Sequence, residues 1–193
     1  MTPLGALAIA LSSAVTCRPA RRLEHSGHAR AAVLVPVLDS ASGPALLLTV
    51  RAAHLSRHAG QIAFPGGRLE PGEDAVAAAL RETYEEVGLV VAPDAVLGAL
   101  DDHPSPFGLI ATPVVACVAW PAVLNVQTDE VTEAFVVPLA QLQAQTPSVE
   151  VRESPWGTRL LYAYEVDGRR VWGLTGNIIK DLLDRLETVQ VAA

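Results

Sequence analysis

Hydrophobic residues along this chain gather in short runs separated by polar turns, a pattern that predicts many strands and few helices. Residues 31–38 form one such run and residues 45–51 another, with a polar turn at 39–44 between them. The two runs predict a β-hairpin. Because Pro36 has no backbone N–H to donate, we expect the first strand to lie at a sheet edge or to contain a bulge.

Further runs predict the remaining elements. The expected strands are 62–64, 95–100, 111–120, 134–137, 149–154, 158–166 and 170–172, with a polar loop at 101–108 that could meet a substrate. The expected helices are the alanine-rich stretch 74–87, a short turn at 139–143 and the periodic segment 177–186. Strands mixed with a few helices predict an α+β or mixed α/β fold, organised as one domain over residues 1–193.

The N-terminal residues 4–11 are apolar and are followed by Cys17, which resembles a signal peptide or lipoprotein start. However, no lysine or arginine precedes the run, and Thr16 fits a cleavage site poorly. The run is also too short to span a bilayer, and no other uninterrupted apolar run reaches the required length. We interpret residues 1–30 as a helix and a connection packed on the domain, and we expect no membrane span.

Composition narrows the class of protein. The 193 residues suit one domain with a sizeable core, and the net charge of −7 argues against non-specific nucleic-acid binding. Two cysteines make no disulfide framework, so we expect a cytoplasmic protein. The basic stretch 17–30 is interpreted as a solvated connection, with the edge of a phosphate site as the alternative.

Candidate chemistry is concentrated in residues 66–89, which predict a loop, a helix and a second loop. Pro71 and Gly72 indicate a turn before the helix, and Gly88 is the expected stop after its last turn. The spacing of Glu82, Glu85 and Glu86 directs the three carboxylates to one side of the helix. Such a cluster is either a solvated acidic face or a site for a hard cation, Mg²⁺ or Mn²⁺.

The full spacing decides between these alternatives. It matches the signature Gly-x5-Glu-x7-Arg-Glu-U-x-Glu-Glu-x-Gly-U, where U is a bulky aliphatic residue, at Gly67, Glu73, Arg81, Glu82, Glu85, Glu86, Gly88 and Leu89. The chain therefore resembles the Nudix hydrolases, and residues 66–89 resemble the Nudix box of that family. Thr83 departs from the pattern at the first U position, where we expect a small packing cost. The resemblance implies the Nudix fold, a mixed β-sheet sandwiched between helices.

The segment before the box resembles one branch of the family. Residues 47–67 are similar to the pattern Leu-Leu-Thr-x-Arg-Ser/Ala-x3-Arg-x3-Gly-x3-Phe-Pro-Gly-Gly of the coenzyme A pyrophosphatases, and residues 172–175 also look like this branch. The resemblance implies that Arg51 and Arg57 bind substrate phosphates, because guanidinium groups bind such oxyanions in a bidentate way. Arg57 lies one residue after the position of the pattern, which Ser56 occupies.

The resemblance also implies roles for the acids. Glu82, Glu85 and Glu86 would bind Mg²⁺ or Mn²⁺, with the carbonyl of Gly66 or Gly67 as a further ligand. Glu73 would pair with Arg81 and brace the box together with Gly67. The general base varies within this family, so Glu130 and Glu133 are both candidates, with exposed loop acids as the alternative.

The implied reaction is metal-dependent hydrolysis of the diphosphate of coenzyme A or a derivative, giving 4′-phosphopantetheine and adenosine 3′,5′-bisphosphate. The implied partner is a small molecule, without nucleic acid or membrane. Two alternatives stay open. One is a pyrophosphatase for another nucleoside diphosphate, such as ADP-ribose or a dinucleotide. The other is a non-catalytic nucleotide-binding regulator, which would have no need of three metal-binding carboxylates.

Overall fold

The structure is a computed structural model that describes residues 3–53, 60–105, 108–154 and 157–192. Strands β1 (Ala29–Ser40) and β2 (Gly43–Arg51) pair antiparallel, with Ser40 opposite Gly43 at the turn, which confirms the predicted hairpin. No helix among the described residues is long and apolar enough to cross a membrane.

The expectation that Pro36 marks a sheet edge or a bulge is wrong, because β1 lies between β2 and β7 and its ladders with these two strands have no register shift. Along one side, β1 changes partner: residues 31–33 pair with β4 and residues 37–40 pair with β2. Leu34 donates its N–H to the carbonyl of Pro65 on that side. Pro36, two residues later, faces the same side in the gap between the two partners, where its missing donor costs no ladder hydrogen bond.

The main sheet has eight strands in the order β3-β2-β1-β7-β5, with β4 paired to β1, β6 to β7 and β8 to β2. The bounds of the further strands are β3 Ile62–Ala63, β4 Gly66–Arg68, β5 Val96–Ala99, β6 His103–Ser105, β7 Leu109–Ala119 and β8 Val131–Pro138. A 3-10 turn, η1 (Pro93–Ala95), precedes β5. The β1–β7 pair is parallel and its neighbours are antiparallel, so the sheet is mixed.

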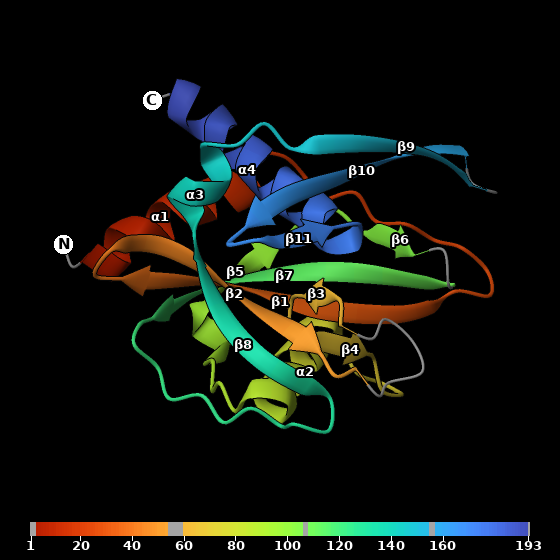
Figure 1. Cartoon of the computed structure of the whole chain (residues 1–193), viewed down its shortest axis with the longest axis horizontal. Coiled ribbons are helices and arrows are strands. Elements are labelled where there is room, and N and C mark those ends of the chain that lie inside the picture. The colour runs from red at the N-terminus through yellow and green to blue at the C-terminus, as the bar shows by residue number, and fades with distance from the viewer. Residues whose placement is uncertain (1–2, 54–59, 106–107, 155–156, 193) are drawn as a thin grey trace.

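Helices cover both faces of this sheet (Figure 1). Leu34 and Leu38 pack with Ala78 and Ala79 of α2 (Ala75–Val87) on one face. Alternate residues of β1, Val35 and Val37, pack on the other face with α1 (Pro3–Thr16), α3 (Leu139–Gln143) and α4 (Leu174–Ala192). This arrangement confirms the predicted mixed sheet between helices.

A second sheet lies over the α4 side and contains β11 (Arg169–Trp172), β10 (Gly157–Val166) and β9 (Ser148–Ser154) in that order. The sequence predicted these three strands but not β4, which forms part of the expected loop before the helix at 74–87 and pairs with β1. It also did not predict β6, which lies within the expected loop at 101–108 and pairs with β7. Strand β6 consists of His103, Pro104 and Ser105, which carry no alternating apolar pattern. Such a strand forms because β7 is available as a partner.

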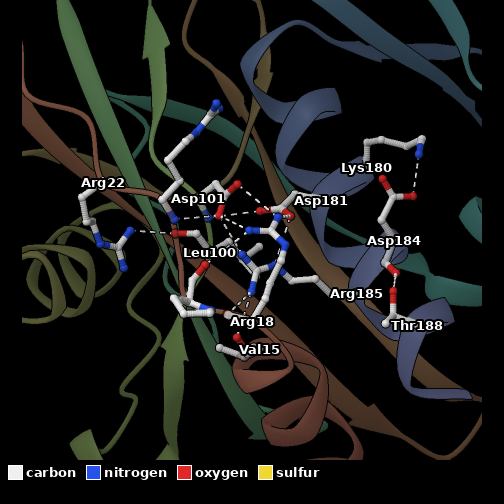
Figure 2. A network of polar contacts seen from close by, with 12 residues as sticks. Val15, Arg18, Arg22, Leu100, Asp101, Lys180, Asp181, Asp184, Arg185 and Thr188 are labelled. Atoms are coloured by element: carbon white, nitrogen blue, oxygen red, sulfur yellow. Dashed lines mark hydrogen bonds and ion pairs between the residues drawn. The ribbon is translucent and has the colours of Figure 1, made fainter. Parts of the chain in front are cut away.

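A buried polar network joins α1, α4 and the start of the 101–108 segment (Figure 2). Arg185 has a side chain 1% exposed and donates to Asp101, to Asp181 and to the carbonyl of Val15. Arg18 donates to the same two carboxylates. Burial raises the pKa of Asp101, but the hydrogen bonds from Arg18 and the Arg21 N–H outweigh it and lower that pKa to about 2.

A neighbouring carboxylate, Asp102, is buried and accepts from Arg22, Arg30 and Thr112. Three arginines of the basic stretch 17–30 therefore bind carboxylates within the protein, which neither predicted interpretation of that stretch included. Asp101 and Asp102, which we expected could meet a substrate, are the acceptors of this network.

We expect Arg185→Lys to lower the free energy of unfolding by about 1–2 kcal/mol, because one ammonium cannot replace the forked donors of a buried guanidinium. The matched control is Asp184→Asn on the same helix, which removes the surface ion pair with Lys180 and should change stability by less than about 0.5 kcal/mol. Urea unfolding measures both. Equal stability of the two variants would contradict a supporting role for the network.

Candidate active site

The helix that carries the candidate chemistry has clear signals at both ends. Asp74 is its N-cap and accepts a hydrogen bond from the Ala77 N–H at 2.8 Å. Gly88 ends it in the left-handed conformation, at φ 67°, and donates to the carbonyl of Tyr84. Thr83 is buried and donates its hydroxyl to the carbonyl of Ala79, so the departure from the bulky pattern leaves no unpaired polar atom.

Arg81 holds the loop against the helix. Its Nε donates to Glu73 Oε1 at 2.9 Å, and its second terminal nitrogen donates to Glu73 Oε2 and to the carbonyl of Arg68. The first terminal nitrogen donates to Glu82 and Glu85. The structure thus brings Glu73 and Arg81 together as predicted, and the same guanidinium fixes one of the candidate metal-binding acids.

Glu86 and Glu82 lie next to the glycine loop, which consists of Gly66 and Gly67. The Glu86 side chain is 3% exposed, accepts the Gly66 N–H at 3.1 Å, and has one oxygen 3.6 Å from a terminal nitrogen of Arg51. Gly67 lies so close to Glu82 that a Cβ there would approach its carboxylate to 2.4 Å. A side chain at Gly66 would instead meet the backbone of Ala32 and Val33. Gly66 is therefore required by the backbone beside it, whereas a side chain at Gly67 would displace the Glu82 carboxylate.

A third acid reaches the same place from a different part of the chain. Asn125 donates its N–H to the carbonyl of Val87, and Gln127 donates to the carbonyl of Glu86. These bonds satisfy carbonyls that the end of the helix leaves without partners. They position the following residues so that carboxylate oxygens of Glu82, Glu86 and Glu130 lie within 4.8 Å of one another. Of the two candidate bases, the structure brings Glu130 to the cluster.

The electrostatics of this cluster fit a divalent cation. Burial raises the pKa of Glu86 to about 7, and the nearby charges of Glu82 and Glu130 add to the increase. Burial also raises the pKa of Glu82, although Arg81 opposes the change. A bound divalent cation would offset this cost of ionising Glu82 and Glu86, and carboxylates provide the hard oxygen ligands that Mg²⁺ and Mn²⁺ prefer.

In the metal-free protein, the free energy of unfolding should fall as pH rises through the titration of Glu86. An unfolded glutamate ionises near pH ~4.3, whereas the folded carboxyl retains its proton up to about pH 7. Between these values the folded state binds more protons, so raising the pH favours unfolding. Glu86→Gln should therefore gain stability over the parent protein, on the order of 2 kcal/mol near pH ~8 and little near pH ~4.5.

Urea unfolding in the presence of a chelator measures this difference. The same stability difference at both pH values would show that Glu86 carries no buried charge in the metal-free protein.

The other predicted residues have different surroundings. Glu85 is half exposed and pairs with Arg81, outside the group of three carboxylates. Glu133 pairs with Arg169 through two hydrogen bonds of 2.9 and 3.0 Å. Arg51 faces Glu86 as described, while Arg57 lies outside the described residues. The metal-binding, catalytic and substrate roles of these residues stay predictions.

A cavity of about 360 Å³ lies beside β2 and is lined by Val50, the residue before Arg51. The residues that line it are Val50, Gly60, Gln61, Ile62, Glu133, Arg169, Arg170 and Trp172. Two of the lining residues are hydrogen-bonded to the backbone of Arg51: Gly60 donates its N–H to the Arg51 carbonyl, and the Arg51 N–H donates to the carbonyl of Gln61. Sequence reasoning missed Arg169 and Arg170. The pair of adjacent arginines before Trp172 was the available signal.

Comparisons with known proteins agree with this geometry. A family model described as the NUDIX domain matches residues 28–157. A protein of Escherichia coli strain K12 named "Uncharacterized Nudix hydrolase NudL" is 39% identical over 169 residues, which cover 86% of each chain. The family model, over residues 28–157, includes β1, the glycine loop, α2 and the segment that carries Glu130.

Solved structures show the same fold. A MutT/nudix family protein from Enterococcus faecalis superposes with a TM-score of 0.58 at 15% identity, covering 89% of this chain and 65% of that one. A MutT protein from Methanosarcina mazei Go1 superposes with a TM-score of 0.56 at 16% identity, covering 88% of this chain and 99% of that one. The family model and the relative from Escherichia coli, which is matched over most of its length, show that the chain belongs to the NUDIX domain family.

Proposed function

We propose that this Nudix hydrolase cleaves the diphosphate of coenzyme A, or of a coenzyme A derivative, to 4′-phosphopantetheine and adenosine 3′,5′-bisphosphate. The observation that carries the proposal is the group of three carboxylates next to Arg51. The coenzyme A assignment itself rests on the resemblance of residues 47–67 and 172–175 to that branch of the family.

The carboxylates would hold the cation. Glu82 and Glu86 are the inner ligands in this proposal, Glu85 serves from the exposed side of the helix, and a carbonyl of Gly66 or Gly67 adds an oxygen. A bound divalent cation supplies charge to neutralise the diphosphate oxygens and lowers the pKa of a neighbouring water. The pair of Glu73 and Arg81 holds the loop against the helix, and the Gly66 N–H orients one oxygen of Glu86.

Arg51 would bind the diphosphate. Its guanidinium lies 3.6 Å from Glu86, so a phosphate oxygen held by this arginine would be beside the carboxylate cluster. Arg57 is proposed as a second phosphate contact on the resemblance alone. The oxygen of water bonds to one phosphorus, the bond from that phosphorus to the bridging oxygen breaks, and the bridging oxygen leaves on the other phosphate.

Glu130 is proposed as the general base that takes a proton from the attacking water. It is exposed at the rim of the cluster, within reach of the position that a water between the acids would occupy. We expect Glu130→Gln to lower turnover about 10²-fold, within the range for removal of a general base. Steady-state kinetics, with Mn²⁺ affinity measured in parallel by paramagnetic resonance, checks this. A variant with unchanged turnover would exclude Glu130 from the reaction.

The parallel affinity measurement separates two roles. Unchanged Mn²⁺ affinity with lower turnover identifies a base, whereas a matching loss of affinity would overturn that assignment and make Glu130 a ligand. Glu133→Gln is the control, because Glu133 is paired with Arg169 and should not alter Mn²⁺ affinity.

The cavity beside Arg51 is proposed to receive a remote part of the substrate. Arg170 provides positive charge for a phosphate, whereas the charge of Arg169 is shared with Glu133 in the same lining. Trp172 provides an aromatic surface for a base. Coenzyme A carries both groups on its adenosine half. A volume of about 360 Å³ accommodates a fragment of that size but not the whole molecule.

The substrate is tested with purified protein and Mg²⁺ or Mn²⁺ against coenzyme A, ADP-ribose and diadenosine polyphosphates. We expect the highest kcat/KM for coenzyme A, with the two predicted products. A preference for ADP-ribose or a dinucleotide would remove the coenzyme A assignment but keep the hydrolase. Binding without cleavage of any of them would instead favour a nucleotide-binding regulator.

A further inference from the structure

The strand β9 forms an outer edge of the small sheet (Figure 1). It pairs with β10 on one side, with Val151 opposite Leu160 and Val149 opposite Tyr162. Among the residues that the structure describes, no strand pairs with its other side. A row of backbone donors and acceptors along such an edge is a template for another strand.

One face of β9 and β10 packs against the core near Tyr162 and remains apolar where it is exposed to solvent. Val149, Val151 and Leu160 are 50%, 61% and 45% exposed. The pairing of β9 with β10 places all three on the same face, since directly opposed residues point the same way. Three adjacent exposed aliphatic side chains beside an open edge favour a protein partner over solvent.

The charges on the opposite face restrict what that partner can be. Glu150 and Arg152 point to the same side of β9, because they are two residues apart, and they form an exposed ion pair with each other. When β9 pairs antiparallel with a second β9 about a twofold axis at Val151, Glu150 of each copy lies opposite Arg152 of the other. On the other face, Val151 then lies opposite its own counterpart, and Val149 of each copy lies opposite Glu153 of the other.

The neighbouring registers lack this complementarity. An axis at Glu150 places that glutamate opposite itself, and an axis at Arg152 places two arginines together. An axis between residues would oppose an outward-facing backbone group with an inward-facing one, which breaks the antiparallel ladder. Of the registers compared, only the axis at Val151 therefore makes the segment Glu150-Val151-Arg152 self-complementary.

We propose that the protein forms a homodimer through antiparallel pairing of β9 with β9 of a second copy, centred on Val151. The two small sheets become one continuous sheet, and the exposed aliphatic side chains next to the axis are shielded from water. The interface is isologous, as a twofold pairing requires. It does not involve the carboxylate cluster, so the proposal does not rest on the proposed function.

Charge exchange tests the register. Glu150→Arg leaves arginine at both positions 150 and 152 of each strand, and Arg152→Glu leaves glutamate at both. Each single variant therefore opposes like charges in the dimer, and we expect its dimer dissociation constant to rise at least about tenfold, given two opposed pairs per interface. The double variant Glu150→Arg/Arg152→Glu restores opposite charges and should dimerise as the parent protein does.

Mixing the two single variants gives a sharper result. A strand with two arginines opposes a strand with two glutamates in the same register, so the mixture should form a heterodimer although each variant alone is largely monomeric. Sedimentation velocity over a concentration series, with circular dichroism to verify folding, measures all of these. The expected parent species has twice the 20.3 kDa mass of the chain.

Glu165→Arg on β10 is the control, because it makes the same charge change away from the β9 edge and should leave the dimer intact. A parent protein that stays at the monomer mass throughout the series would overturn the proposal. So would single variants that dimerise like the parent, or a mixture that forms no heterodimer, since either result would place any self-association elsewhere.

Discussion

Replacing Glu86 with glutamine is expected to lower the turnover of a diphosphate substrate by at least about two orders of magnitude. Glutamine has nearly the same size and can still accept the Gly66 N–H, so the loop should keep its position. It lacks the negative charge, which in the proposed site helps to hold the cation. Steady-state kinetics at saturating Mg²⁺ and Mn²⁺ gives the comparison.

The matched control is Glu70→Gln, which removes an exposed acid from the loop before the same helix. It should leave turnover unchanged. A folded Glu86→Gln protein with the parent rate would show that Glu86 has no part in holding a cation during the reaction.

The second large effect is expected from Gly67→Ala, which should lower turnover by about one to two orders of magnitude while the protein stays folded. A Cβ at this position would approach the Glu82 carboxylate to 2.4 Å, and a carboxylate at the end of a flexible side chain can move away. The fold therefore tolerates the methyl group, but Glu82 no longer lies with Glu86 and Glu130. Activity is lost through geometry and not through charge.

Gly66→Ala provides the contrast. Its φ is 153°, and a Cβ there would lie 2.3 Å from the carbonyl oxygen of Ala32, which the sheet holds in place. Backbone cannot yield as a side-chain end can, so we expect a loss of about 3 kcal/mol in the free energy of unfolding. Thermal unfolding and kinetics on both variants separate the effects. Parent activity in Gly67→Ala, or parent stability in Gly66→Ala, would contradict the close approach of this loop.

The features that the sequence predicted well are those with local causes. Asp74, the alanines after it and Gly88 each act within a few residues, so the helix and both of its ends could be predicted. The strand pattern of residues 31–51 is also local. Pro36 was misjudged because its tolerance depends on two different strands that meet beside β1, and no pattern within the run reports them.

Helical geometry explains why the three acids of the box differ in their surroundings. At about 100° per residue, Glu82 and Glu86 are about 40° apart around the helix axis, and Glu85 lies on the other side of Glu82 from Glu86. Arg81 lies four residues before Glu85 and therefore meets it. The sequence showed that the acids share one side of the helix, but it could not show that a turn after β7 would bring Glu130 to two of them.

Anomalous diffraction from a crystal soaked with Mn²⁺ tests most directly whether the acids at the end of α2 hold divalent cations. We predict a manganese peak at the carboxylates of Glu82 and Glu86, on the side that faces Glu130, and its loss in Glu86→Gln crystals soaked in the same way. An empty cluster in the parent crystal, or the same peak in the variant, would contradict the account.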